Sequence, residues 1–268
     1  MSSKLSSLFL AGIGLFVIAV AGSANGQQPN LGYDDTPLQP NGKWRIHDSR
    51  RPQPKVVAPG PFVSAGAPED AVILLGAGND LSKWQTDAGL AAPWPMAGGV
   101  LQTGKGIIRT KSEFTDLQLH VEFATPSNVV GDSQDRGNSG VLLAGAFEIQ
   151  VLDSYQNPTY ADGQAAAMYG QYPPLVNASR QPGEWQSYDI TFAAPKFDLK
   201  GELTAPALVT ILHNGVLVHH ARAFWGGTRH RAIGPYSPAM ARGPIRLQDH
   251  GNPVRYRNIW LRELSDPQ

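Results

Sequence analysis

Polar side chains that could do chemistry lie on one strand-like run near the middle of the sequence. In "AFEIQVLDSY" the apolar residues alternate with Glu148 and Gln150, and Asp153 stands at the end of the run. Arg136 and Asn138 enter the preceding run, "SGVLL", so they should flank the same polar face. Arginine is a natural partner for a carboxylate, because its guanidinium donates paired hydrogen bonds. A solvent-facing strand would show the same alternation, so polarity alone does not identify a site.

A second cluster lies near the C-terminus, in "PIRLQDHG". Here Ile245 and Leu247 alternate with Arg246, Gln248 and His250. Histidine is the side chain whose ordinary pKa lies nearest neutrality, so His250 is a candidate general base. The alternative is a turn histidine beside the following glycine.

The remaining histidines do not form a metal-binding pattern. His219 and His220 are neighbours on a strand-like run and should point to opposite faces, so they cannot both bind one metal. No HxH or HExxH spacing occurs. We therefore expect no cofactor and no catalytic transition metal, while a requirement for calcium or another divalent ion stays open.

Aromatic side chains provide a further indication of carbohydrate binding. Sugar rings have apolar faces that pack on aromatic rings, while their hydroxyls take hydrogen bonds. We expect Trp185 and Trp260, which lie in strand patterns, to be core residues. Six others lie in loops or irregular segments, where they could line a cleft: Trp94, Tyr155, Tyr160, Tyr169, Tyr172 and Trp225.

Short β-like runs separated by turn signals must position these residues. From residue 71 onward ten or more such runs occur, and Gly 29 and Pro 22 indicate many turns. The Asn214-Gly215 pair predicts a tight hairpin, and another should turn at Gly145. No sustained helical period appears. The sequence therefore predicts an all-β sandwich of two antiparallel sheets at residues 69–268. The irregular stretch 154–183 is long for a connection, and such loops are often functional.

The N-terminal part of the chain has a different composition. Lys4 precedes an uncharged apolar run from Leu8 to Ala21, which is shorter than the roughly 20 residues of a membrane-spanning helix. We expect a signal peptide at residues 1–26 and a periplasmic or secreted protein; a retained anchor is the alternative. Residues 27–68, rich in Pro and Gly, should form an extended arm anchored by Trp44 and Val56.

Charge and cysteine content exclude several classes of partner and of stabilisation. Lys+Arg 22 against Asp+Glu 22 gives no attraction to nucleic acid or, after signal cleavage, to an anionic membrane. With Cys 0 neither disulfides nor a lipidated N-terminus is available, so an apolar core must hold the domain together.

Five motifs in order resemble the 3-keto-disaccharide hydrolase family: "RGNSGVLL", "FEIQVLDSY", "GEWQSYDITFAAPKFD", "LVTILHNGVLVH" and "PIRLQDHGNPVRYRNIWLREL". The resemblance runs from Ala71 to Leu264 and implies a concanavalin A-like jelly roll. The arm is similar to that of secreted planctomycete members. The resemblance implies that the site includes Arg136, Asn138, Glu148, Gln150, Asp153, Gln248 and His250.

The implied activity is cleavage of glycosides that a partner sugar 3-dehydrogenase has already oxidised at carbon 3. The ketone acidifies the proton on carbon 2, so a base can remove it and expel the aglycone from carbon 1; water then adds to the product. This route needs one general base, a group that polarises the ketone and an acid. We expect Glu148 or His250 to be the base and Asp153 to assist. Arg136, Asn138, Gln150 and Gln248 should bind the substrate.

Two other functions stay open. Jelly-roll glucanases carry a strand of the form E-apolar-D-apolar-(x)-E, and here Gln150 replaces the central acid, which disfavours direct hydrolysis. A non-catalytic carbohydrate-binding module would suit the arm and the aromatic loops equally well. Binding needs only aromatics and amides, whereas elimination needs Glu148 or His250.

Overall fold

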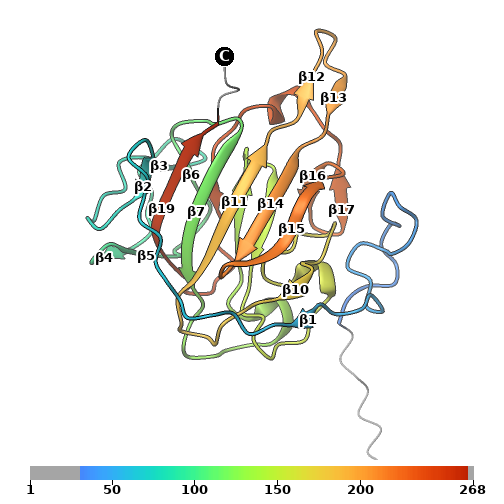
Figure 1. The fold of residues 1–268 in the computed structure, drawn as a ribbon, viewed down its shortest axis with the longest axis horizontal. Helices are drawn as coiled ribbons and strands as arrows, with labels where there is room; N and C mark the ends of the chain where they lie inside the picture. The colour runs from blue at the N-terminus through green and yellow to red at the C-terminus, as the bar shows by residue number, and fades with distance from the viewer. Residues whose placement is uncertain (1–30, 265–268) are drawn as a thin grey trace, which may run out of the picture.

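The protein is a sandwich of two antiparallel sheets, as predicted, and Figure 1 shows the larger one face-on. The computed structural model describes residues 31–264, so the predicted signal peptide lies outside the described residues. The larger sheet, here called the long sheet, has strand order β15-β14-β11-β7-β19-β5-β4, with β2 also paired to β19. The smaller sheet, here called the short sheet, has order β3-β6-β18-β8-β9.

The strands of the long sheet are, in sheet order, β15 (Val216–Ala223), β14 (Leu208–His213), β11 (Gln186–Ala193), β7 (Leu117–Ala124), β19 (Arg255–Glu263), β5 (Val100–Gln102) and β4 (Met96–Ala97), with β2 (Val72–Leu75). Those of the short sheet are β3 (Trp84–Thr86), β6 (Ile108–Thr110), β18 (Arg246–Leu247), β8 (Ser139–Leu143) and β9 (Phe147–Val151). Three small pairs complete the β-structure: β1 (Lys55–Val56) with β10 (Val176–Asn177), β12 (Lys196–Phe197) with β13 (Leu203–Ala205), and β16 (Gly227–Arg229) with β17 (Ala232–Gly234). The helical turns are η1 (Ser133–Asp135), η2 (Ala161–Gly163) and η3 (Pro238–Met240).

The core lies between the two sheets and follows from strand alternation. Phe147, Ile149 and Val151 of β9 are fully buried against the long sheet, and the Phe147 ring lies 5.7 Å from that of Phe192. Burial of each such side chain contributes about 1.5–3 kcal/mol. The alternation therefore leaves Glu148 and the other even-numbered residues of β9 on the outer face of the short sheet.

Both predicted hairpins form. β8 and β9 are joined at Ala144 and Gly145, with φ values of 46° and 67°, and Arg136 and Asn138 precede β8 instead of lying within it. β14 and β15 are joined at Asn214 and Gly215 with φ values of 53° and 78°, as an Asn-Gly hairpin turn requires.

The arm lies along the domain and is anchored by the backbone of Val56 and Val57, which pairs with β10, and by side chains other than the predicted ones. Val56 is 70% exposed and Trp44 is half-buried, whereas Ile46, His47 and Arg51 are buried. The later part of the arm crosses the lower end of the long sheet between β1 and β2 (Figure 1).

Glu122, a buried residue of β7, holds that later part of the arm. Its carboxylate accepts hydrogen bonds from Ser64, from Arg257 Nε at 2.6 Å and from Asn258 Nδ2 at 2.8 Å. Burial raises the pKa of Glu122, but the hydrogen bond with His120 and then those from Ser64, Asn258 and Arg257 lower it to about 2. No helix in residues 31–264 is long and apolar enough to cross a bilayer.

Some aromatic predictions are wrong because a loop position does not exclude burial. Trp94 lies in the core, 2% exposed, with its Nε1 donating to the Gly106 carbonyl at 2.9 Å. Trp260 is buried as predicted, but on the outer face of the long sheet, where it stacks on His120. Trp185 is half-buried beneath the Arg257 guanidinium and is not a core residue.

Candidate active site

The register of the short sheet brings polar residues from distant parts of the sequence into one row. Residues that pair directly across antiparallel strands point to the same face. From β3 to β9 the paired residues are Gln85, Arg109, Arg246, Leu142 and Glu148. The row lies on the outer face, opposite the core.

Glu148 and Gln248 meet over Gly140. Gly140 pairs with Gln150, and its carbonyl accepts a hydrogen bond from the Gln248 backbone nitrogen at 3.1 Å. A Cβ at position 140 would lie 2.9 Å from Glu148 Oε1 and would also clash with the Gln248 side chain. The absence of a side chain at Gly140 therefore leaves space for the two polar groups.

The Glu148 carboxyl is an unusual acid. It is only 6% exposed, and burial raises its pKa to about 8, although its interaction with the Gln248 side chain opposes the shift. Burial disfavours the charged carboxylate because it removes water from the group. A carboxyl with this pKa can exchange a proton near neutral pH, as a general acid or base must.

Gln150 and Asn138 lie beside this pair, as predicted. Gln150 Nε2 donates to Gln134 Oε1 at 3.0 Å and lies 3.5 Å from Asn138 Oδ1, while Gln150 Oε1 is buried and lacks a hydrogen-bond partner. Asn138 Nδ2 in turn donates to the Gln134 carbonyl at 2.7 Å. Gln134, which the sequence did not single out, thus fixes both predicted amides.

His250 joins the site through Gln248. Its Nε2 lies 3.2 Å from Gln248 Oε1, so this nitrogen carries the proton and donates it. Its Nδ1 is then free to accept a proton. Burial of the His250 ring lowers its pKa, although the residue as a whole is exposed at the surface. The structure therefore places Glu148, Gln248 and His250 in one chain of neighbours, with Gln150 on the same strand face as Glu148.

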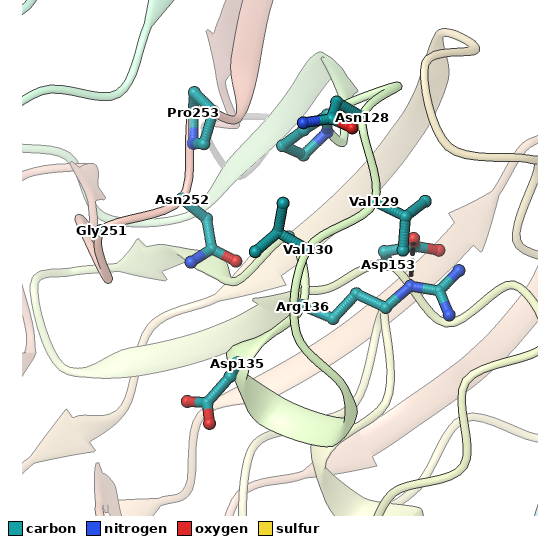
Figure 2. Close-up of a pocket in the computed structure, with 11 residues that line it drawn as sticks. Asn128, Val129, Val130, Asp135, Arg136, Asp153, Gly251, Asn252 and Pro253 are labelled. Carbon is teal, nitrogen blue, oxygen red and sulfur yellow. Dashed lines mark hydrogen bonds and ion pairs between the residues drawn. The ribbon is translucent and has the colours of Figure 1, made fainter.

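Arg136 and Asp153 form a separate pair beside that cluster (Figure 2). Arg136 Nε donates to Asp153 Oδ2 at 2.7 Å, and Asp153 is 2% exposed. Both line a cavity of about 300 Å³, together with Val129, Val130 and Asn252. Arg136 thus pairs with an acid as expected, but the acid is Asp153, and neither residue shares the outer face with Glu148.

Tyr169, which the sequence did not assign to the site, lies next to Glu148, and His230 lies behind it next to Tyr169. The Tyr169 backbone nitrogen donates to the Glu148 carbonyl at 3.2 Å, and the Tyr169 hydroxyl lies 3.4 Å from His230 Nδ1. Tyr169 was expected only as one of several cleft aromatics. For Tyr169, the length of the irregular stretch 154–183 was the other sequence signal of a role in the site. In residues 31–264 no group of three or more His, Cys, Asp or Glu side chains is arranged to hold a metal.

Comparison with known proteins agrees with this fold. The family model for the 3-keto-alpha-glucoside-1,2-lyase-like domain matches residues 71–262. A solved structure from Parabacteroides distasonis ATCC 8503, assigned provisionally as a glycosyl hydrolase, shares 43% identity over 80% of this chain and 93% of its own, with a TM-score of 0.72. A second structure from that organism with the same provisional assignment shares 22% identity over 72% of this chain and 99% of its own, with a TM-score of 0.51. No curated protein matches the chain.

The family match and the structure of 43% identity identify a carbohydrate-related protein of the glycosyl-hydrolase-like kind. The chain belongs to the 3-keto-alpha-glucoside-1,2-lyase-like family, which confirms the resemblance drawn from its motifs.

Proposed function

We propose that the protein cleaves 3-keto-glycosides by elimination and hydration. The observation that carries this proposal is the environment of Glu148: a buried carboxyl whose neighbours over Gly140 are amides. A retaining glycosidase needs a second carboxylate about 5–5.5 Å away as nucleophile. In the glucanase strand pattern Gln150 stands at the central acid and Asp153 at the final one, and Asp153 is paired with Arg136 instead of facing Glu148. A single carboxyl that can exchange a proton near neutral pH, as Glu148 can, suits elimination better than direct hydrolysis.

In this mechanism Glu148 acts as the base. Its carboxylate takes the proton from carbon 2, and the electron pair moves toward the keto oxygen on carbon 3, where Gln248 or Gln150 can donate a hydrogen bond. The electrons then return to form the carbon 1–carbon 2 double bond as the carbon 1–oxygen bond breaks. The departing aglycone oxygen takes up a proton from the protonated His250 ring, and water later adds to the unsaturated sugar.

The reverse assignment has the same residues in exchanged roles. His250 Nδ1 would take the carbon 2 proton, and Glu148 would protonate the leaving oxygen, since the pKa of Glu148 of about 8 keeps it mostly protonated at neutral pH. The two assignments differ in the pH at which the base becomes active. Either one requires that a sugar 3-dehydrogenase supply the oxidised substrate.

A non-catalytic sugar-binding module is the second candidate, and Glu148 distinguishes the two. Binding alone does not benefit from a carboxyl held uncharged in a buried position, which costs stability whenever it ionises. The test is turnover of a 3-keto-disaccharide by the wild type and by Glu148→Gln. If the wild type binds the sugar without cleaving it, the module is the correct assignment. Export to the periplasm or the medium is part of the proposal and would place the enzyme beside extracellular glycosides.

A further inference from the structure

One end of the polar row is closed by a segment that pairs with the free edge of β9. Met168 bridges to Ile149, so Tyr169 stands opposite Glu148 on the outer face. The Tyr169 ring is half-exposed, and its hydroxyl lies 2.8 Å from that of Tyr160. Tyr169 is therefore the next side chain in the row after Glu148.

The N-terminal arm packs directly behind Tyr169. The His47 ring is fully buried, 4.7 Å from the Tyr169 ring and 4.1 Å from the Tyr160 ring. Its backbone nitrogen donates to Asp162 Oδ2 at 3.0 Å, and its Nδ1 lies 3.1 Å from Asp162 Oδ1. The buried His47 Nε2 has no hydrogen-bond partner. A residue of the arm thus supports the aromatic end of the row.

Further contacts make this packing rigid. Gln39 Nε2 donates to Asp162 Oδ2 at 3.2 Å and to the carbonyls of Gly170 and Gln171 at 3.0 and 2.9 Å. Arg51 Nη1 lies 3.6 Å from Asp162 Oδ2 and donates to the Gln171 carbonyl at 3.2 Å. These bonds fix the arm to the segment that carries Tyr169.

The arm also holds the turn between β16 and β17, which carries His230. The Arg231 guanidinium lies 4.2 Å from the centre of the Tyr33 ring and is paired with Asp35 at 2.5 Å. The Tyr33 and His230 rings meet edge-on at 6.1 Å. Tyr169 and His230 are therefore both supported from behind by residues of the arm.

The other end of the row has no such support. Beyond Leu142 it continues with the side chains of Arg246 and Arg109, which are 30% and 23% exposed and share Asp87 as an ion-pair partner. The row therefore runs from Tyr169, which the arm supports, past Glu148 to the partly exposed arginines of β18 and β6.

We propose that the arm forms the closed end of the substrate site, so that the site accepts only a terminal 3-keto-glycosyl unit, with the aglycone directed along Arg246 and Arg109. This proposal rests on the proposed function. At the closed end Tyr169 contacts the terminal sugar, and His47 is a positioning residue that acts through Tyr169.

The test compares a 3-keto-disaccharide with the trisaccharide that carries one more glucosyl unit on oxygen 4 of the keto sugar. For the wild type, kcat/KM should be at least about a hundredfold lower on the extended sugar, because the added unit meets Tyr169. Tyr169→Ala and His47→Ala should shift this ratio at least about tenfold in favour of the extended sugar. The exposed arm variant Val56→Ala should leave it unchanged.

The ratio separates a specificity role from a structural one, because loss of folded protein lowers both rates equally. Equal wild-type rates on the two sugars would overturn the closed end while leaving the proposed function intact. An unchanged ratio in folded Tyr169→Ala protein would also overturn it. A wild type inactive on the disaccharide would instead contradict the proposed function, and the closed end with it.

Discussion

The backbone nitrogen of Gln248 donates to the carbonyl of Gly140 at 3.1 Å, and this bond sets the Gln248 side chain beside Glu148 above a residue without a Cβ. Gly140→Ala would add a methyl group 2.9 Å from Glu148 Oε1. We expect kcat/KM to fall by about a hundredfold, since displacement of a reacting group by about 1 Å has effects of that order. Gly78→Ala, where a Cβ meets no atom within 4 Å, is the control. An active Gly140→Ala enzyme would remove Glu148 and Gln248 from the mechanism.

The pH dependence of cleavage should identify the general base. A base works deprotonated, so log(kcat/KM) should rise with pH and level off only above pH 8, with its midpoint near 8, if Glu148, whose pKa burial raises to about 8, is the base. His250 has its pKa lowered by burial from 6.5, so a histidine base would put the midpoint below pH 6.5. Steady-state kinetics measured from below pH 6.5 to above pH 8 show which of the two midpoints occurs and so identify the base. Persistence of a midpoint near 8 in Glu148→Gln would exclude Glu148 as its source.

Glu148 should also make stability depend on pH. Its pKa rises from 4.5 to about 8 on folding, so the folded state binds this proton more tightly. The stabilising effect of the proton is fully present below pH 4.5 and is lost as pH rises through 8. Each pKa unit corresponds to about 1.4 kcal/mol, so the loss is on the order of several kcal/mol.

Glu148→Gln removes this titration, because an amide binds no proton in this range. Its melting temperature relative to wild type should therefore be higher at about pH 8.5 than at about pH 5. The exposed Glu113→Gln serves as the control variant. A constant difference at both pH values would mean that Glu148 is not protonated in the folded protein.

The Arg136–Asp153 pair should prove important for stability. Asp153 is 2% exposed, so Arg136→Met leaves a buried carboxylate without its partner and should cost about 3–5 kcal/mol in the free energy of unfolding. The double variant Arg136→Met/Asp153→Leu should lose less, because no unpaired charge remains. Denaturant unfolding of the wild type, Arg136→Met, Asp153→Leu and the double variant measures this. A double variant as unstable as the sum of both single changes would show that the pair does not interact energetically.

Alternation in single strands made much of the structure predictable. In β9 the alternation of apolar and polar residues distinguishes the core face from the outer face. The Asn214-Gly215 pair specifies the hairpin between β14 and β15 by itself. A two-residue period places Glu148 and Gln248 each on the polar face of its own run, so only the order of the strands was needed to bring them together. For Glu148 the sequence could not give the pKa, which depends on burial.

The contribution of the arm was not predictable, because it depends on contacts between distant segments. His47 and Asp162 are 115 positions apart, and neither lies in a periodic run. His47 also adopts a φ of 56°, which the sequence does not signal. Trp94 shows a different kind of error. Its position in an irregular segment was interpreted as exposure, although the side chain is buried in the core.

The oxidation state of the substrate tests the central claim most directly. The purified protein is incubated with a 3-keto-disaccharide and, in parallel, with the same disaccharide unoxidised, and release of the aglycone sugar is measured. We expect cleavage of the keto sugar alone, because only its carbon 2 proton is acidic enough for removal by a carboxylate. Glu148→Gln should lose activity by about a hundred- to ten-thousand-fold. Comparable rates on both sugars would contradict elimination and favour direct hydrolysis.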